Sequence, residues 1–420
     1  MPESSQVVRS SHVIVIGAGI VGLSCAVKLA ENGVDVTVID KNQVGHGCSY
    51  GNAGWMTPCF AMPLPMPGMF FKSLRWLLNP EGPLYIKPSL SPDLMSWLIL
   101  FLRAMNEKQA RAAIEALVKL SQLSLQEYEK LAVEFPEIQF EKRGLLMVSH
   151  TAQGLKAAVE SMNLVSNHQV SGRKMTADEV RSFEPSLRGN LQGGVYFPDE
   201  AQAEPLRVVQ ALAFKARALG VRILEEAELF RVETDQGQVR SLATSHGTLR
   251  ASQYVLATGS WSKDLARQLR LSIPILGGKG YSLIVPPLSV QPKVPMMLVE
   301  RKIAITPRKD SLRIAGTLEL VDQDFSVTHS RVQSIIKGAR EFLPVPEDLQ
   351  IQELWRGLRP CTPDGVPLIG FSRKLSNLML ACGHQMLGLQ SGLGTGVLVA
   401  DLMTKGSSPW DRAVYSPDRF

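Results

Sequence analysis

The chain has 420 residues, of which 45% are hydrophobic and 20% are charged, and its formal net charge is +6. This composition is typical of a globular protein with a sizeable core, and the length predicts two or three domains. The charge is small for this length and no dense run of lysine and arginine occurs, which argues against a nucleic-acid-binding protein.

The five cysteines are scattered and include no CxxC pair, so neither a zinc site nor a disulfide framework is predicted. A reducing compartment fits them best, with a Cys48–Cys59 disulfide as a minor alternative. No run of 18 apolar residues without a charge exists, so no membrane-spanning helix is predicted. The polar N-terminus and the lack of a small-residue cleavage site argue against a signal peptide.

The chain is predicted to begin with a βαβ unit. His12–Ile16 is a short β-branched run typical of a buried parallel strand, and a glycine turn follows it. A helix is predicted from that turn to about Asn32, with Gly33 as the residue after its end. Val36–Ile39 is then predicted as the second buried strand.

The next segments are a long loop and several helices. Gly45–Gly68 is rich in Gly, Pro and Met, and loops of this length in compact proteins usually have a function. The bulky apolar segments Met69–Leu78 and Leu94–Met105 are predicted to be helical. Asn106–Glu134 carries its apolar residues on one stripe and is predicted to be a long helix.

In the second half, a helix is predicted over Pro205–Leu219, with proline in its first turn and Gly220 past its end. Four strands are expected to return to the sheet of the first unit: Val221–Leu224, Leu229–Val232, Val239–Ala243 and Tyr254–Ala257.

The last segments are predicted to complete a second sheet and then the first. Ser282–Thr317 is predicted to form antiparallel strands, and Arg331–Phe342 a helix. The last strand is predicted at Leu378–Ala381, and a final helix from about Gly392 to Met403.

The glycine turn after the first strand has the GxGxxG pattern of a dinucleotide-binding fold. Gly17 permits the tight turn, Gly19 lets the backbone approach a pyrophosphate, and Gly22 lets the helix pack on the strand. Ile20 and Val21 lie at the start of the helix, whose positive end favours the pyrophosphate.

An acidic residue ends the second strand. Asp40 can accept hydrogen bonds from both ribose hydroxyls, and Lys41 follows it at the same edge of the predicted sheet. A glycine-rich turn without a ligand is the alternative interpretation, which the combination of strand, helix and acid argues against. The fingerprint alone does not separate FAD from NAD.

Three further segments have the small residues or helix start that suit an extended cofactor. They are the loop after the second strand, the turn after the Tyr254–Ala257 strand, and the start of the last helix, which can stabilise negative charge on a reduced flavin. Each alone could be an ordinary loop. The candidate contacts are Cys48, Ser49, Gly51, Asn52, Ala53, Thr258, Gly259, Gly388 and Leu389.

Together these motifs resemble the D-amino acid oxidase superfamily of FAD-dependent oxidoreductases, and within it the bacterial D-amino acid dehydrogenases. The resemblance spans nearly the whole chain. It is carried by the opening fingerprint, the Cys48–Gly54 loop, Lys279–Ser282, Gly357–Gly370 and Gly383–Gly396.

The chain departs from the family pattern near the expected substrate site. Family dehydrogenases often have Ser-Phe-Ala-Asn-Ala-Gly at the position of Ser49–Gly54, and often Gly and Thr in place of Gln385 and Met386. The loop Trp55–Gly68 also differs, and is weakly similar to the subgroup that oxidises cyclic imino acids such as D-hydroxyproline. Because of these departures the resemblance does not identify the substrate, but it still implies FAD as the cofactor.

The expected fold is α/β, with a discontinuous Rossmann-like FAD-binding domain and an inserted α+β substrate domain built on an antiparallel sheet. The FAD-binding domain is predicted to comprise residues 11–75, 200–270 and 352–418. The substrate domain is predicted to comprise residues 76–199 and 271–351.

The resemblance implies that Arg359 binds the substrate carboxylate, and the planar guanidinium suits that group. A structural salt bridge is the alternative. Tyr281 is expected to lie on the substrate side of the flavin and donate to the same carboxylate, or else to be a half-buried strand residue. His384 and His46 are left without a role, and no metal site is predicted.

The implied reaction is oxidation of a D-amino acid or cyclic D-imino acid, with hydride transfer from the α carbon to flavin N5. The alternatives are an enzyme for glycine, sarcosine or a 2-hydroxy acid, and an FAD-holding subunit of a larger complex. Turnover by the purified chain would distinguish an enzyme from an FAD-holding subunit.

Apolar segments with interleaved basic residues suggest contact with a membrane surface and a quinone acceptor. The expected location is the bacterial cytoplasm, on the inner face of the cytoplasmic membrane. Packing within the protein or an oligomer contact is the alternative. The basic residues are Lys72, Arg75, Lys87 and Arg103, and the apolar ones are Met62, Leu64, Met66, Met69, Phe70, Phe71, Leu74, Trp76, Leu77, Leu78 and those of Leu94–Met105.

Overall fold

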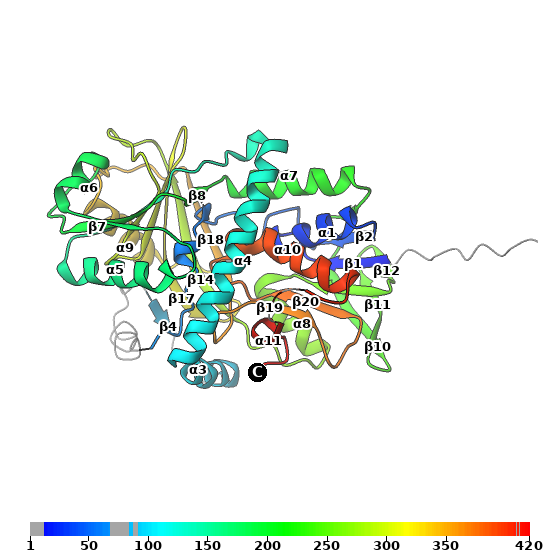
Figure 1. Cartoon of the computed structure of the whole chain (residues 1–420). Coiled ribbons are helices and arrows are strands. Elements are labelled where there is room, and N and C mark those ends of the chain that lie inside the picture. Colours follow the sequence, from blue (N-terminus) through cyan, green and yellow to red (C-terminus); the bar gives the residue numbers. More distant parts are fainter. Residues whose placement is uncertain (1–11, 68–83, 87–90, 409, 411) are drawn as a thin grey trace, which may run out of the picture.

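The computed structural model describes residues 12–67, 84–86, 91–408, 410 and 412–420. These residues form two lobes, each built on one large sheet (Figure 1). Across the described residues, no helix is both long and apolar enough to cross a membrane.

The first lobe contains a six-stranded sheet in the order β19-β20-β13-β1-β2-β9. Its strands pair in parallel except for β19, which runs antiparallel to β20. The central strands are mostly apolar because helices or loops cover both faces of a mainly parallel sheet. The strands are β1 (His12–Ile16), β2 (Asp35–Ile39), β9 (Arg222–Leu224), β13 (Gln253–Leu256), β19 (Leu368–Phe371) and β20 (Leu378–Cys382).

The predicted βαβ unit at the start of the chain is confirmed. β1 and β2 pair in parallel with Ile16 opposite Ile39, and α1 (Ile20–Glu31) connects them. Gly33 has φ = 77°, the left-handed conformation expected of a glycine just after a helix. The strands predicted around residues 222, 254 and 378 also join this sheet, as β9, β13 and β20.

The prediction that Leu229–Val232 and Val239–Ala243 return to this sheet is wrong. Both belong to a separate antiparallel sheet. The turn between them contains Gln236 and Gly237, both with positive φ, and such a two-residue turn closes a hairpin rather than a parallel crossover. The sheet consists of β10 (Leu229–Asp235), β11 (Gln238–Thr244) and β12 (Gly247–Leu249).

The second lobe contains a nine-stranded sheet in which β18, β14 and β17 are neighbours. The antiparallel strands predicted between Ser282 and Thr317 are confirmed as parts of this sheet, although β14 begins at Leu276 and β17 extends to Val321. Its strands are β4 (Leu84–Ile86), β5 (Leu145–Ser149), β6 (Arg173–Met175), β7 (Gly193–Phe197), β14 (Leu276–Val285), β15 (Met296–Leu298), β16 (Ile303–Pro307), β17 (Leu312–Val321) and β18 (Glu353–Cys361).

The strands of the two sheets can be compared with the predicted domain boundaries. The six-stranded sheet draws its strands from residues 11–75, 200–270 and 352–418, as proposed for the FAD-binding domain. However, β18 lies within 352–418 and yet pairs with β14 of the second sheet. We therefore propose that the chain changes lobes at the end of β18, near Cys361.

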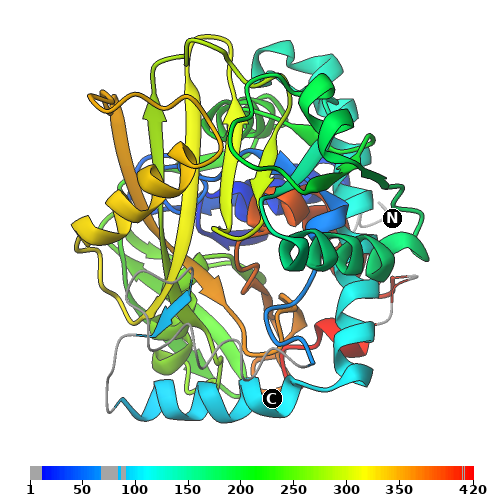
Figure 2. The same cartoon turned by 90° about the vertical axis from the view of Figure 1, so that its left-hand side faces the viewer.

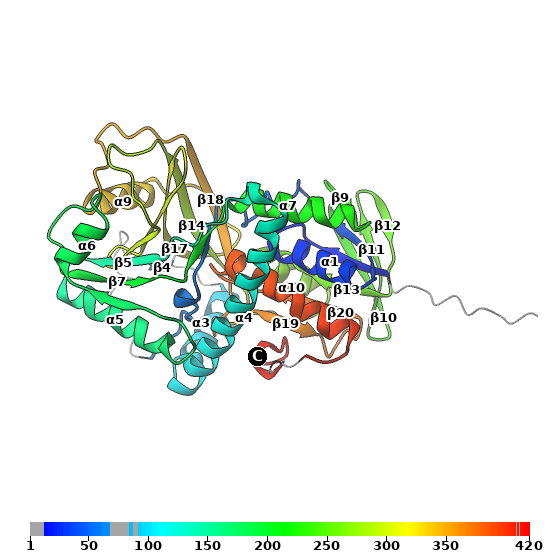
Figure 3. The same cartoon turned by 45° about the horizontal axis from the view of Figure 1, so that its top comes forward.

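The helix predicted near the C-terminus, α10 (Gly388–Thr404), packs between α1 and α4 (Glu107–Glu134) (Figure 3). A Cβ atom on Gly394 would lie 2.6 Å from the Leu120 carbonyl oxygen, and one on Gly396 would lie 2.5 Å from the Ser24 carbonyl oxygen. Only glycine permits such an approach between helices. The helix begins at Gly388 rather than at the predicted Gly392.

The helices predicted at Leu94–Met105 and Pro205–Leu219 are confirmed as α3 (Pro92–Ala104) and α7 (Pro205–Ala218). The predicted Met69–Leu78 helix lies outside the described residues. Figure 2 shows α3 along one edge of the molecule, beside the start of α4. The other helices are α5 (Ala152–Ser166), α6 (Ala177–Phe183), α8 (Ser262–Gln268), α9 (His329–Arg340, predicted at Arg331–Phe342) and α11 (Arg412–Tyr415).

Candidate active site

A cavity of about 1250 Å³ is lined by residues of both lobes. One end is formed by the β1–α1 turn and the end of β2. The wall then passes along the Cys48–Ala53 loop to β17, β18 and the start of α10. Pockets for drug-sized ligands have volumes of roughly 300–1,000 Å³, so this cavity has room for a dinucleotide and a small substrate.

The glycines of the fingerprint are each required by a close contact. Gly17 has φ = 111°, and a Cβ atom there would lie 2.5 Å from the Ala257 carbonyl oxygen. Gly22 does not line the cavity, but its Cβ would lie 1.9 Å from the Gly17 carbonyl oxygen, so it serves helix packing. Gly19 lines the cavity, with only the Ser49 hydroxyl close to its Cβ position. The backbone is therefore open to a ligand at Gly19.

Asp40 is held at the same end of the cavity by two backbone amides. Its Oδ2 accepts a hydrogen bond from Ala18 N at 2.7 Å, and its Oδ1 accepts one from Asn42 N at 2.9 Å. Burial raises the pKa of the Asp40 carboxyl, while these amide donors act in the opposite direction. The side chain is thus fixed where a ribose would lie.

The wall beside Asp40 is completed by Lys41 and by the turn after β13. Lys41 lines it, and its ammonium lies over the Trp261 ring at 4.4 Å from the ring centroid. Thr258 and Gly259 line it from the turn after β13.

The small-residue loop after β2 lies against the cavity and is anchored from both sides. Ser49 Oγ accepts a hydrogen bond from Ile20 N at 3.1 Å, which joins the loop to the start of α1. The Arg313 guanidinium donates to the carbonyl oxygens of Tyr50 and Asn52. A Cβ atom on Gly51 would lie 2.0 Å from the indole of Trp355, so the loop backbone packs directly on that ring.

Cys48 lines the cavity in the same loop and carries a thiol. Its Sγ donates a hydrogen bond to the Leu358 carbonyl oxygen at 2.7 Å, and burial raises its pKa to about 11. All five cysteines are free, so the alternative of a Cys48–Cys59 disulfide is wrong.

Arg359 lines the opposite part of the cavity from β18. Its Nη1 donates a hydrogen bond to the Thr317 carbonyl oxygen at 2.6 Å, and the guanidinium lies over Gly280. Burial lowers its pKa, and none of the groups found to act on that pKa is a carboxylate. Arginine nevertheless remains protonated. The described residues therefore leave this cation without an anionic partner.

The start of α10 closes the same end of the cavity. Gly388 and Leu389 line it, together with His384 and Gln385 from the preceding turn. The His384 Nε2 lies 2.9 Å from the Thr395 hydroxyl, and burial lowers the pKa of the imidazole to about 3. His384 is therefore neutral at physiological pH, and the positive end of α10 is the nearby electrostatic feature that favours an anion.

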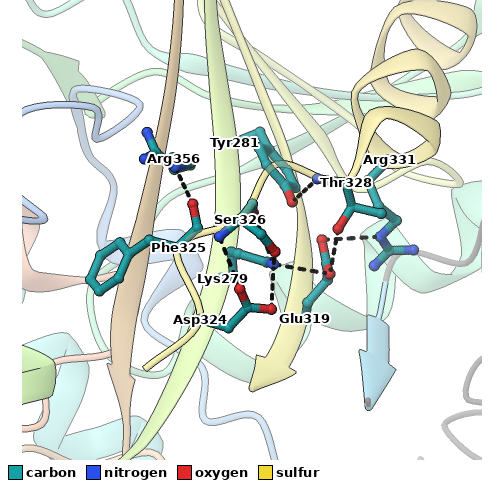
Figure 4. Close-up of polar contacts among 9 residues, drawn as sticks. All are labelled: Lys279, Tyr281, Glu319, Asp324, Phe325, Ser326, Thr328, Arg331 and Arg356. Atoms are coloured by element: carbon teal, nitrogen blue, oxygen red, sulfur yellow. Dashed lines mark hydrogen bonds and ion pairs between the residues drawn. The ribbon is translucent and has the colours of Figure 1, made fainter. Parts of the chain in front are cut away.

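Tyr281 is not brought to the cavity. Its side chain is fully buried in the core on the other face of the sheet, and its hydroxyl accepts a hydrogen bond from Thr328 N at 3.0 Å (Figure 4). Side chains alternate along a strand, and Gly280, the residue before Tyr281, faces Arg359. We therefore no longer assign Tyr281 to the substrate.

Lys279 shares the Tyr281 face and lies in a buried polar network. Its ammonium pairs with Asp324 at 3.2 Å and Glu319 at 3.7 Å, and it donates to the Ser326 carbonyl oxygen at 3.0 Å (Figure 4). The network fastens the 322–328 segment to the sheet. The Lys279–Ser282 motif thus supplies structure on one face of the sheet, and on the other face Gly280 leaves the space that the Arg359 guanidinium occupies.

The sequence did not single out Thr317 or Trp355, which also line the cavity. The signal for Trp355 was available, because an aromatic residue two positions before Gly357 can pack on a glycine of the facing loop. No local sequence signal marks Thr317, whose role depends on the pairing of β14 with β17.

The residues of the cavity fit FAD. The open backbone at Gly19, the fixed carboxylate of Asp40 and the helix start at Gly388 are parts of one continuous wall. The first two suit a pyrophosphate and a ribose, and the third suits a flavin that becomes negatively charged on reduction.

Comparison with known proteins agrees with this geometry. The sequence profile of the family described as FAD dependent oxidoreductase matches residues 12–402. The chain is 33% identical to a D-amino acid dehydrogenase of Vibrio atlanticus, covering 94% of this chain and 97% of the relative. It is 34% identical to one of Chromohalobacter salexigens, covering 93% and 95%.

Solved structures show the same fold at lower identity. Glycine oxidase from Geobacillus kaustophilus has a TM-score of 0.78 at 22% identity, covering 98% of this chain and 99% of that one. L-proline dehydrogenase from P. horikoshii has a TM-score of 0.76 at 22% identity, with 98% of each chain covered. The chain therefore belongs to the FAD dependent oxidoreductase family, whose cofactor is FAD.

Proposed function

We propose that this protein is a dehydrogenase that oxidises a D-amino acid, or a cyclic D-imino acid such as D-hydroxyproline, at its α carbon. The observation that carries the proposal is the Arg359 guanidinium, which faces the cavity without a carboxylate partner among the described residues. An uncompensated buried cation is unfavourable, so a ligand carboxylate is the natural partner. The name of the relative from Vibrio atlanticus, D-amino acid dehydrogenase, supports the same substrate class.

In this proposal the chain orients the substrate, and FAD, when bound, supplies a hydride acceptor at N5. Arg359 binds the carboxylate through its planar fork, which fixes the α carbon relative to the cavity wall. Trp355, Leu387 and Met297 line the cavity and exclude water from it. His384 stays neutral and holds no positive charge that would repel the substrate ammonium.

The cofactor contacts are proposed for the sequence-predicted residues that line the cavity. Lys41 and Asp40 would lie at the adenosine end, and the Cys48–Ala53 loop along the middle. Gly22 supports the turn without contacting the ligand. The proposed contacts are Gly17, Gly19, Ile20, Val21, Asp40, Lys41, Cys48, Ser49, Gly51, Asn52, Ala53, Thr258, Gly259, Gly388 and Leu389.

We also propose that electrons pass to a quinone-type acceptor at the inner face of the bacterial cytoplasmic membrane. The cavity lining includes Trp97 and Phe101 of α3 and Leu164 of α5, which is exposed. α3 itself exposes Met95, Ile99 and Leu102 on one side. A cavity whose wall includes residues of α3, beside the apolar surface of that helix, suits an acceptor that arrives from lipid.

The deciding experiment is an anaerobic screen in which bleaching of the flavin absorbance reports substrate oxidation. The compounds are D-amino acids, D-proline, D-hydroxyproline, their L-enantiomers, glycine, sarcosine and 2-hydroxy acids. We expect rapid bleaching by D-amino or D-imino acids only. Bleaching by glycine, sarcosine or 2-hydroxy acids alone would assign a different substrate, and no bleaching by any compound would indicate an FAD-holding subunit.

A further inference from the structure

Thr317 in β17 adopts a backbone conformation that β-branched residues avoid. Its φ angle is +60°, in the left-handed region, where such a residue is a genuine outlier. Strain of this kind persists only where the surrounding structure enforces it, and it concentrates at functional sites.

A β-bulge explains the conformation. β14 and β17 pair with Lys279 opposite Glu319 and with Tyr281 opposite Gly316. Two residues of β17, Thr317 and Leu318, therefore lie opposite the single residue Gly280. Bulges of this kind re-aim a backbone group or a side chain, and here the Thr317 carbonyl oxygen is turned toward Arg359, whose Nη1 bonds it at 2.6 Å.

The side chain of Thr317 is left without a partner at the same place. Thr317 lines the cavity, yet its hydroxyl oxygen is buried and makes no hydrogen bond within the described structure. A buried hydroxyl without a partner is unfavourable. Rotation about χ1 moves the hydroxyl between staggered positions, so this group of a cavity-lining residue can turn toward a bound ligand.

We propose that Thr317 is a second substrate-binding residue, and that its hydroxyl donates a hydrogen bond to the carboxylate held by Arg359. The inference rests on the proposed function, because it takes the carboxylate of that substrate as the ligand. A carboxylate has two oxygens and about four acceptor positions, so a bidentate guanidinium leaves room for the hydroxyl. The β-bulge thus has two roles. The Thr317 carbonyl oxygen orients Arg359, and the Thr317 hydroxyl binds the substrate carboxylate.

The test is stopped-flow reduction of the FAD-loaded enzyme under anaerobic conditions. D-Proline and D-alanine are the carboxylate probes, and D-prolinamide is the probe without a carboxylate. The dependence of the bleaching rate on concentration separates the dissociation constant from the limiting rate. The variants are Thr317→Val, which keeps the branched shape and removes the hydroxyl, Thr317→Ser, which keeps the hydroxyl, and Arg359→Leu.

We expect Thr317→Val to raise the dissociation constant of D-proline about 10- to 100-fold, as for loss of a hydrogen bond to a charged group. Thr317→Ser should stay within about threefold of the wild type, and D-prolinamide should not distinguish Thr317→Val from the wild type. Thr317→Gly, which also removes the backbone strain, should show the same loss as Thr317→Val.

Two results would overturn the inference while leaving the proposed function intact. One is a normal dissociation constant for Thr317→Val when Arg359→Leu shows a large loss. The other is an equal loss in Thr317→Ser, which would make the side-chain shape rather than the hydroxyl responsible. If Arg359→Leu also binds D-proline normally, or the wild type is not reduced by either probe, the proposed function itself fails.

Discussion

The Arg359 guanidinium lies directly over Gly280, where a Cβ atom would come within 2.3 Å of its central carbon. Both residues are in neighbouring strands, β18 and β14, in which Gly278 is the residue paired with Arg359. The position of the cation therefore depends on the absence of a side chain at residue 280.

Replacing Gly280 with Ala should displace the guanidinium without changing any charge. We expect kcat/KM for the carboxylate substrate to fall about 10- to 100-fold, because a misplaced orienting group can cost that much. The FAD content should be unchanged, since Gly280 does not line the cavity. Steady-state kinetics measure kcat/KM, and the flavin spectrum measures the FAD content. An unchanged kcat/KM would show that the function of Arg359 does not depend on the missing side chain at Gly280.

Replacing Arg359 with Leu should leave FAD bound and weaken carboxylate substrates. The loss of a charge-assisted contact costs about 2–4 kcal/mol, or roughly 30- to 1000-fold in kcat/KM. Arg359→Lys is the matched control, because it keeps the charge but not the planar fork. We expect it to fall between the wild type and Arg359→Leu, and a near-normal Arg359→Leu enzyme would refute the assignment.

The parts of the site that could be predicted from the sequence are those set by local rules. The turn at Gly17, the helix that starts beside it and the acid at Asp40 follow from residues close together in the chain. The hairpin of β10 and β11 was not predicted, because Gln236 in its turn adopts a left-handed conformation that is not typical of glutamine.

The substrate end depends instead on which strands pair and in what register. Tyr281 and Gly280 are neighbours, and only the pairing of three strands decides which of them faces the cavity. The bulge at Thr317 is likewise a property of the sheet and not of the threonine. Arg359 was identified because a family resemblance, and not a periodicity, pointed to it.

Glu200 provides a pH test of stability. It is 2% exposed, its Oε1 accepts from Cys59 N at 3.0 Å, and its Oε2 has no hydrogen-bond partner in the described structure. Burial raises its pKa from 4.5 to about 8. Between these two values the folded protein holds a proton that the unfolded chain has lost, so this group makes stability fall as pH rises.

Glu200→Gln should therefore be more stable than the wild type at pH 9, by roughly 3–5 kcal/mol, and similar to it below pH 4.5. Unfolding by urea at several pH values measures this difference in stability. The buried His384 is present in both proteins, so its contribution to the pH dependence does not affect the difference. Asp199→Asn is the matched control, because it removes an exposed carboxylate from the adjacent position. A difference between wild type and Glu200→Gln that does not grow with pH would contradict the raised pKa.

Gln385 offers a test of substrate range. It lines the cavity in a left-handed conformation, with φ = 50°, and its Nε2 makes no hydrogen bond to the described residues. Gln385→Gly should relieve about 1 kcal/mol of backbone strain and enlarge the cavity. We expect the ratio of kcat/KM for D-phenylalanine to that for D-alanine to increase, with no decrease in melting temperature. An unchanged ratio would mean that Gln385 does not limit the substrate side chain.

The membrane proposal now rests on α3, because Met69–Leu78 and the basic residues Lys72, Arg75 and Lys87 lie outside the described residues. Three apolar side chains of α3, Met95, Ile99 and Leu102, are 52%, 49% and 48% exposed. They are spaced by four and three residues, so they share one side of the helix, and the exposed Arg103 follows them. Such a side suits the boundary between lipid headgroups and acyl chains.

The wild type should therefore pellet with vesicles that contain anionic lipid at low salt, and the triple variant Met95→Ser, Ile99→Ser, Leu102→Ser should pellet much less. Val133→Ser is the matched control, since Val133 is 85% exposed on α4, away from α3, and its loss should have no effect. Flavin reduction by substrate should be the same in all three proteins, because these side chains do not line the cavity. If the triple variant pellets as the wild type does, or the wild type stays in the supernatant, α3 packs against another part of this protein or a second copy rather than a lipid surface.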